Sequence, residues 1–176
     1  AGIGPNKIDQ VIGVVKAYSS RVGEGPFPTE ETGDMGEYLR EKGCEFGTTT
    51  SRPRRCGWLD LVVLRYAIRV NGLTEICLTK LDVLDELKKI KICTAYDTPE
   101  GRIKEFPVDG DVFANATPVY DELPGWEEDI SQLNSYDELP DNAKRYIKYL
   151  ENTTGVTISL VSVGSKRSQT IHLLEA

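Results

Sequence analysis

Hydroxyl and guanidinium side chains are concentrated in one short segment. Residues 47–60 read Gly-Thr-Thr-Thr-Ser-Arg-Pro-Arg-Arg-Cys-Gly-Trp-Leu-Asp. Hydroxyls and backbone N–H groups bind carboxylate or phosphate oxygens at short range, and arginine adds charge and bidentate geometry. Because the whole chain has a formal net charge of -7, this local positive charge predicts an anion site rather than a polyanion-binding surface. The alternative is a solvated basic loop, although Gly47, Gly57 and Trp58 favour a loop held in place.

A second candidate is the triplet Lys80-Leu81-Asp82, which follows an apolar run at 75–79. An aspartate here can accept two hydrogen bonds from N1–H and the 2-amino group of guanine, a donor pair that adenine lacks. The lysine stem can lie along the purine face. Ligands of open α/β sheets bind beyond the carboxyl ends of strands, where this triplet is expected. The alternative is a surface Lys-Asp pair on a loop.

A third candidate is Ser162-Val163-Gly164, which ends an apolar run and precedes Ser165-Lys166-Arg167. Its backbone N–H groups could bind a nucleotide, or it could be an ordinary turn. The sequence shows no glycine-rich phosphate loop ending in Gly-Lys-Ser/Thr, no paired metal-ligand cysteines and no evident catalytic set. The motifs therefore indicate binding and do not by themselves supply catalysis.

The elements that must position these residues follow from apolar periodicity and turn residues. Strands are predicted at 11–18, 75–79, 90–96, 102–106, 156–163 and 170–174, and the first of them is expected to be buried on both faces. Helices are predicted from a Thr29 cap to about Gly43, from Asp60 to Asn71, and at 141–152. Residues 120–126 are expected to form an ordered loop. Together these predict an α/β fold with a mixed, mainly parallel sheet and flanking helices.

Length and composition fit one ordinary domain or a large piece of a longer protein. The chain has 176 residues, 39% hydrophobic and 28% charged, so a packed core is expected and global disorder is not. Its acidic balance argues against nucleic acid as the main partner, and no apolar run approaches the ~20 residues of a membrane helix. The first residues, Ala-Gly-Ile-Gly-Pro, lack an initiator Met, so we expect a segment of something longer.

Five segments together resemble the C-terminal part of the adenylosuccinate synthase family, and the likeness runs nearly end to end. They are Val14-Val-Lys-Ala-Tyr18, Arg21-Val-Gly-Glu-Gly-Pro-Phe-Pro-Thr-Glu30, Glu45-Phe-Gly-Thr-Thr-Thr50 with Arg52-Pro-Arg-Arg-Cys-Gly-Trp-Leu-Asp60, Leu78-Thr-Lys-Leu-Asp-Val-Leu84 and Leu123-Pro-Gly-Trp126. The resemblance implies that residues 1–176 are the C-terminal region of such an enzyme, without the N-terminal phosphate-loop region.

The resemblance also implies a reaction. IMP and L-aspartate condense, driven by GTP, to give adenylosuccinate, GDP and phosphate, in a Mg²⁺-dependent ligase of purine and AMP biosynthesis. The 6-oxygen of IMP is first phosphorylated, and aspartate then displaces the phosphate. The family implies a cytoplasmic homodimer, with no nucleic acid or membrane partner. The alternative is a non-catalytic purine-nucleotide-binding module or an inactive fragment.

Site residues carry over by position. Thr48, Thr49, Thr50, Ser51, Arg52, Pro53 and Arg54 match the loop that closes on aspartate. Arg52 also matches an IMP contact, and Arg54 a GTP contact. Further GTP contacts match Lys80, Leu81, Asp82, Ser162, Val163 and Gly164.

Two departures qualify this carry-over. Ser51 stands where the family usually has glycine, and a positive φ there would strain the loop by roughly 1 kcal/mol. The family's general-base aspartate, which also ligates Mg²⁺, and its assisting histidine lie in the N-terminal part. No catalytic or metal-binding residue is therefore expected in this chain, and the 176 residues alone are expected to lack ligase activity.

Overall fold

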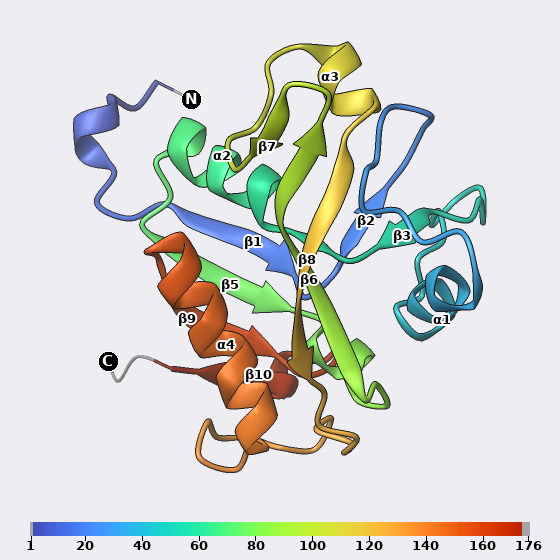
Figure 1. Ribbon diagram of the computed structural model, residues 1–176. Helices are drawn as coiled ribbons and strands as arrows, with labels where there is room; N and C mark the ends of the chain where they lie inside the picture. The colour runs from blue at the N-terminus through green and yellow to red at the C-terminus, as the bar shows by residue number, and fades with distance from the viewer. Residues whose placement is uncertain (1, 174–176) are drawn as a thin grey trace.

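The computed structural model describes residues 2–173, and Figure 1 shows the arrangement of its elements. The α-helices are α1 (Asp34–Lys42), α2 (Leu61–Asn71), α3 (Gly110–Ala114) and α4 (Asp141–Thr154). The strands are β1 (Ile12–Lys16), β2 (Ser19–Arg21), β3 (Arg55–Gly57), β4 (Leu59–Asp60), β5 (Glu75–Thr79), β6 (Lys89–Thr98), β7 (Gly101–Ile103), β8 (Thr117–Pro124), β9 (Thr157–Ser162) and β10 (Thr170–His172). Short 3-10 helices are η1 (Pro5–Lys7), η2 (Leu81–Leu84) and η3 (Arg167–Gln169).

The sheet that carries the predicted site has the strand order β1-β5-β9-β10. β1, β5 and β9 are mutually parallel, and β10 is antiparallel to β9. The α/β prediction with a mixed, mainly parallel sheet is therefore confirmed for this layer. The predicted last strand at 170–174 ends at His172 in the structure, and Leu174 lies outside the described residues.

A second sheet, β4-β6-β7 with β8 also on β6, is mainly antiparallel, and β2 and β3 form a separate pair. Figure 1 shows β6 running between the lower right and the top of the view and its antiparallel partner β8 coming down across it to the lower centre, with α4 in front of the four-stranded sheet. The Tyr146 hydroxyl of α4 donates to the Ala17 carbonyl at 2.7 Å, which joins this helix to the end of β1.

Asp60 begins α2, as predicted. Its Oδ1 accepts hydrogen bonds from the backbone N–H groups of Val62 and Val63 at 3.0 and 3.2 Å. Its Oδ2 accepts the Tyr96 hydroxyl of β6 at 2.5 Å. One buried carboxylate therefore caps the helix and joins it to the second sheet. The helix ends at Gly72, whose φ of 60° is the left-handed conformation typical of such ends.

The prediction that Thr29 caps the first helix is wrong. The helix α1 begins at Asp34 after Gly33 and ends at Gly43, so only its end was predicted correctly. Thr29 is fully buried, and its carbonyl accepts the Trp58 N–H at 3.2 Å. The close approach needs Gly57, because a Cβ there would lie 1.9 Å from the Thr29 carbonyl oxygen.

Two further predictions need correction. β1 is not buried on both faces, since the Val14 side chain is 74% exposed at the sheet edge. Val14 and Val63 of α2 line an apolar groove of ≈ 440 Å³. The apolar face of α2 is therefore only partly covered by the rest of the protein. Residues 120–124, expected as a loop, belong to β8, whose prolines lie at Pro118 and Pro124 near the strand ends. Trp126 is buried as an anchor just after the strand.

No helix within residues 2–173 is long and apolar enough to cross a membrane.

We predict that Asp60→Ala lowers the free energy of unfolding by about 3 kcal/mol, because it removes the helix cap and leaves the buried Tyr96 hydroxyl without an acceptor. Urea unfolding of the purified protein measures this change. Tyr96→Phe removes only the hydroxyl contact and is expected to cost about 1 kcal/mol. Equal losses for the two variants would contradict a capping role for Asp60.

Candidate functional site

Parallel pairing brings the carboxyl ends of three strands to one edge of the sheet. Lys16 at the end of β1 pairs with Thr79 at the end of β5, and Leu78 pairs with Val161 of β9. Lys80–Asp82 and Ser162–Gly164 therefore leave neighbouring strands at the same edge. This confirms the predicted position of Lys80–Asp82 beyond a strand and brings two of the three candidate motifs together.

The turn after β5 is held in an unusual backbone conformation. Lys80 has φ 60° and ψ 35°, and its Nζ donates to the Gly43 carbonyl at the end of α1 at 2.6 Å. Asp82 lies in the first turn of η2, and its Oδ1 is buried without a hydrogen-bond partner in the described part of the chain. Burial raises the pKa of Asp82, although the nearby Lys80 and Lys42 act in the opposite direction. The turn thus presents a partly desolvated carboxylate with unused acceptor capacity.

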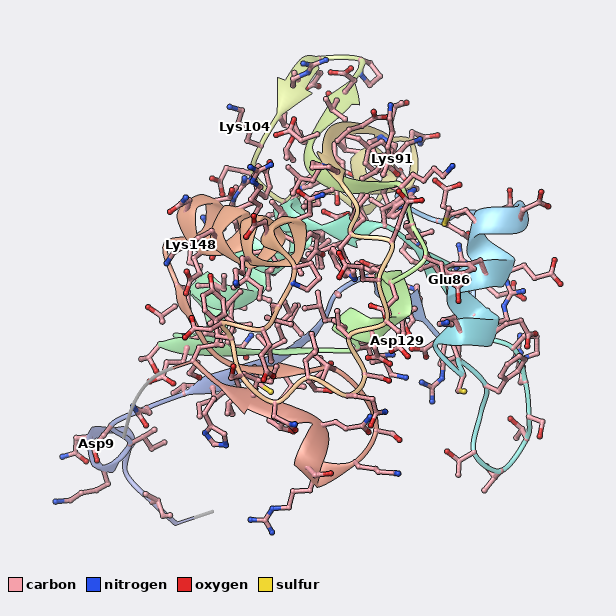
Figure 2. The ribbon with its side chains drawn as sticks, turned by 90° about the horizontal axis from the view of Figure 1, so that it is seen from below. Asp9, Glu86, Lys91, Lys104, Asp129 and Lys148 are labelled. Atoms are coloured by element: carbon pink, nitrogen blue, oxygen red, sulfur yellow. The ribbon has the colours of Figure 1, made fainter. Side chains whose placement is uncertain are left out.

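A pocket of ≈ 310 Å³ opens beside Asp82. Its lining is strongly acidic and consists of Lys42, Asp82, Asp85, Glu86, Glu127, Glu128, Asp129 and Ser131. Figure 2 labels two of these carboxylates, Glu86 and Asp129, close to η2 and on the same side of the molecule as α1. Such a pocket suits a ligand group that donates hydrogen bonds. Its negative charge repels phosphate.

Asp85 supports this pocket from beneath. Its Oδ1 accepts the Trp126 indole N–H at 2.8 Å, and its Oδ2 accepts the Ile130 backbone N–H at 3.2 Å. Burial, with a further contribution from the charges of Asp82 and Asp129, raises the pKa of Asp85 to about 6 against the effect of these two hydrogen bonds. Asp85 therefore fixes the 126–130 segment, which forms the far wall of the pocket.

The Ser162–Gly164 segment offers fewer donors than expected. The Val163 N–H already donates to the Gln169 carbonyl at 2.9 Å, and the Ser162 hydroxyl donates to the Gly164 carbonyl at 2.9 Å. Val163 is fully buried. Of the N–H groups of Val163 and Gly164, only that of Gly164 makes no hydrogen bond within residues 2–173. These two residues can therefore offer a ligand one backbone donor at most.

Residues 48–54, here called the anion loop, are anchored at both ends. The Gly47 N–H donates to the Arg52 carbonyl at 2.9 Å, and the Arg54 N–H donates to the Glu45 carbonyl at 2.9 Å. The Arg40 side chain donates to the Arg54 carbonyl at 2.9 Å. Between these anchors, residues 48–53 are exposed to solvent. The loop is therefore held in place, as its glycines suggested, while its hydroxyls remain accessible.

Ser51 adopts a positive φ of 51°. Its N–H donates to the Gly47 carbonyl at 2.8 Å, which closes the tip of the loop. This is the left-handed region where a residue with a Cβ costs roughly 1 kcal/mol relative to glycine. The condition under which serine strains this loop is therefore met.

A pocket of ≈ 200 Å³ lies against the anion loop. The guanidinium groups in its lining come from Arg21, Arg52, Arg54 and Arg55, and Glu24 is its one acidic lining residue. Arg55 is paired with Glu30 at 2.5 Å, whereas neither Arg21 nor Arg52 forms an ion pair with any described residue. The pocket therefore retains net positive charge, as an anion site requires.

The two pockets share no lining residue, so the structure does not place the anion loop and Asp82 in one cleft. They are joined through the end of α1. The Gly43 carbonyl accepts Lys80, and two residues later the Glu45 carboxylate accepts Arg54 at 2.8 Å. The charge of Asp82 also contributes to the raised pKa of Tyr18, which donates to Glu45, although burial is the main cause.

Sequence reasoning missed the supporting carboxylates Glu45 and Asp85. Their partners lie between 9 and 45 residues away along the chain, so local spacing carries no signal for either contact. The one available hint is composition, because Glu45 stands between Cys44 and Phe46, and Asp85 follows the apolar residues Val83 and Leu84.

The residues 2–173 contain no group of three or more His, Cys, Asp and Glu side chains arranged to hold a metal ion.

We predict that Asp85 makes the folded state less stable as the pH rises from about 4 to 6. A carboxyl whose folded pKa is raised binds its proton more tightly when folded, so its stabilisation is present at low pH and lost through this window. Asp85→Asn cannot ionise, so the variant should gain up to about 3 kcal/mol relative to the unmodified protein over that window.

Urea unfolding between pH 4 and 7 measures this difference. Glu100→Gln, at the exposed turn between β6 and β7, controls for the loss of one carboxyl group. A constant offset between Asp85→Asn and the unmodified protein across the pH range would show that Asp85 is not protonated on folding.

Comparison with known proteins identifies this arrangement. A family model described as adenylosuccinate synthetase matches residues 1–171. The chain is 56% identical over 173 residues to adenylosuccinate synthetase of Caldanaerobacter subterraneus subsp. tengcongensis, covering 98% of this chain and 40% of the relative. It is 58% identical over 173 residues to that of Moorella thermoacetica, again covering 98% and 40%.

A solved structure of fully ligated adenylosuccinate synthetase from Plasmodium falciparum superposes with a TM-score of 0.94 at 46% identity. It covers 98% of this chain and 42% of that one. The chain thus spans about 40% of the length of the curated relatives it matches. On both sequence and fold, the chain belongs to the adenylosuccinate synthetase family.

Proposed function

We propose that this chain is the C-terminal region of an adenylosuccinate synthetase. In the full-length enzyme, IMP and L-aspartate would be joined to adenylosuccinate as GTP is converted to GDP and phosphate. The described residues supply binding and orientation in this reaction. Asp82 selects the guanine base, and the anion loop takes the anionic substrates. The general base and the acid that assist phosphoryl transfer come from residues outside this chain.

The observation that carries the proposal is the buried Asp82 Oδ1 without a partner at the end of β5. A buried acceptor that makes no hydrogen bond costs about 1–3 kcal/mol, so such an atom in a pocket indicates a ligand donor. Guanine supplies two adjacent donors to one carboxylate, whereas adenine and hypoxanthine do not supply that pair. We assign the stem of Lys80, whose Nζ donates to the Gly43 carbonyl, to the face of the base.

The acidic lining of the Asp82 pocket gives the nucleotide an orientation. Glu86, Glu127, Glu128 and Asp129 surround the same space as Asp82 and repel a triphosphate. The base therefore enters this pocket, and the phosphates extend away from it. Positive charge is found at Lys16, at the end of β1, and at Arg54 of the anion loop, which are linked through Glu45.

The anion loop fits the remaining substrates. Its exposed hydroxyls at Thr48, Thr49 and Thr50 can donate to a carboxylate, and Arg52 has no acidic partner in the described chain. We assign the loop to L-aspartate, Arg52 additionally to IMP, and Arg54 additionally to GTP. Ser162–Gly164 is assigned a secondary GTP contact through its Gly164 N–H.

Three properties of the whole enzyme remain proposals that rest on the family alone. Mg²⁺ would neutralise the phosphates of GTP, and the resemblance assigns its ligands to the part of the enzyme outside this chain. A homodimer and a cytoplasmic location are likewise expected for the full-length enzyme.

We predict that the full-length enzyme forms adenylosuccinate from IMP, L-aspartate, GTP and Mg²⁺, whereas residues 1–176 alone form none. The isolated segment binds but has no general base for the transfer. Product formation is followed by absorbance and chromatography. No product from the full-length enzyme would reject the function, and turnover by the segment would reject its proposed division of labour.

We predict that Asp82→Asn in the full-length enzyme raises KM for GTP by at least about tenfold, because the amide replaces one acceptor by a donor that opposes the guanine amino group. Preference for GTP over ITP, which lacks the 2-amino group, should fall as well. Steady-state kinetics with both nucleotides measure the two effects.

Asp9→Asn is the matched control. Asp9 is exposed and lies on the opposite side of the molecule from Asp129 in Figure 2. It should leave both KM values unchanged. An unaltered ratio of GTP to ITP specificity in Asp82→Asn would remove the guanine assignment while leaving the ligase activity itself intact.

A further inference from the structure

The most deeply buried carboxylate near the site has no role in the function described so far. Glu45 is 1% exposed and accepts three side-chain donors. Lys16 and Tyr18 donate to its Oε1 at 2.6 and 2.5 Å, and the Arg54 Nη1 donates to its Oε2 at 2.8 Å. We call these four residues the Glu45 cluster. It joins the end of β1, the end of α1 and the anion loop at a single carboxylate.

The charges in the Glu45 cluster do not cancel. Burial alone would raise the pKa of Glu45, but hydrogen bonds from Lys16, Tyr18 and Arg54 outweigh it and lower the pKa, so the carboxylate is ionised. Lys16 and Arg54 each carry a positive charge, against one negative charge on Glu45. A net positive charge remains, at Lys16 and Arg54, whose side chains are 29% and 32% exposed. The cluster can therefore still attract an anion.

The Arg54 guanidinium is used on one side only. Its Nη1 is held by Glu45, while its Nε is buried without a partner, and Nη2 makes no hydrogen bond to any described residue. The Nε–Nη2 edge of a guanidinium is the fork that binds a carboxylate or phosphate with two parallel hydrogen bonds. Arg54 lines the pocket of the anion loop. Glu45 thus binds the guanidinium through Nη1 and leaves Nε and Nη2 without hydrogen-bond partners.

The backbone reinforces this arrangement. The Glu45 N–H donates to the Arg40 carbonyl at 2.8 Å, and the Arg54 N–H donates to the Glu45 carbonyl at 2.9 Å. Arg54 is therefore tied to Glu45 through both main chain and side chain. A long arginine side chain loses rotamer entropy when a ligand immobilises it, and a residue that fixes it beforehand removes part of that cost.

We propose that Glu45 is a positioning residue that holds Arg54 so that its unpartnered Nε–Nη2 edge is kept for the anionic ligand of the anion loop. This inference rests on the proposed function of that loop. Glu45 touches no substrate in this scheme and acts only through Arg54. Lys16 and Tyr18 keep the carboxylate ionised and fixed in place.

The test uses Glu45→Gln in the full-length enzyme. Its amide keeps the shape of the side chain, but it loses the charge and turns one acceptor into a donor that faces Arg54 or Lys16. We expect KM for L-aspartate to rise about tenfold, with a smaller change in kcat. Affinity for inorganic phosphate, titrated calorimetrically without turnover, should fall to a similar extent.

A double-mutant cycle with Arg54→Leu separates positioning from general damage. If Glu45 acts through Arg54, adding Glu45→Gln to Arg54→Leu should change KM for L-aspartate by no more than about twofold. Full additivity of the two effects would overturn the proposal, as would an unchanged KM in Glu45→Gln. If Glu45→Gln does not fold, Glu45→Asp, which keeps the charge but retracts it from Arg54, carries the same expectations.

Glu151→Gln is the control for loss of a partly buried glutamate. Glu151 pairs with Lys148 at 2.9 Å and accepts the Ile158 N–H at 3.0 Å, near the start of β9 and away from its carboxyl end. It should leave KM for L-aspartate unchanged. Failure of the proposed function would appear in the unmodified enzyme as absent product. Failure of this inference would appear only in the variants, in an enzyme that turns over and binds phosphate normally.

Discussion

Parallel hydrogen bonding between β1, β5 and β9 is the constraint on which the rest of the site depends. It fixes Lys16 beside Thr79 and Leu78 beside Val161, so the chain leaves all three strands at one edge. Lys80–Asp82 and Ser162–Gly164 leave from this edge, and the anion loop is linked to it through Glu45, which accepts hydrogen bonds from both Lys16 and Arg54. A shift of one residue in the β1–β5 register would turn Lys16 to the other face and separate it from Glu45.

The site contains two buried carboxylates, and burying each of them costs free energy. Asp82 and Asp85 lie one turn apart, and burial raises the pKa of both. Asp85 recovers part of this cost through Trp126 and Ile130, whereas the Oδ1 of Asp82 recovers none within the described chain. This difference is why we assign Asp85 a supporting role and propose Asp82 as the residue that binds a ligand. Burial and charge repulsion alone do not distinguish the two, but the count of hydrogen-bond partners does.

The sequence predicted those parts of the fold that depend on neighbouring residues. Asp60 as a cap, Gly72 as a helix end and Lys80–Asp82 beyond a strand all follow from local chemistry, and all are found. Thr29 has the chemistry of a cap too, but a tertiary contact with the Trp58 N–H uses its backbone instead. Residues 120–124 have the composition of a loop, yet β6 provides a partner that the local sequence does not reveal.

The candidate site shows the same division. The residues proposed to contact ligands stand in short motifs, so they could be named from the sequence. The carboxylates that hold those motifs were not predicted, because Glu45 meets Lys16 across 29 positions and Asp85 meets Trp126 across 41. Spacing along a chain says nothing about such pairs until the strand order is known. Glu45 lies within a segment that resembles the family, but the resemblance implies no role for it.

The anion loop combines fixed ends with a strained tip. Hydrogen bonds from Gly47 and Arg54 hold its ends, so the loop cannot relax by moving as a whole, and the positive φ of Ser51 stays in place. Residues 48–53 between these ends are exposed to solvent, so the strained Ser51 lies in the hydroxyl-bearing tip. Arg54, held by Glu45 outside that tip, is insulated from it. The loop thus combines an exposed, hydroxyl-bearing tip with a guanidinium, Arg54, that a buried carboxylate holds at the loop's end.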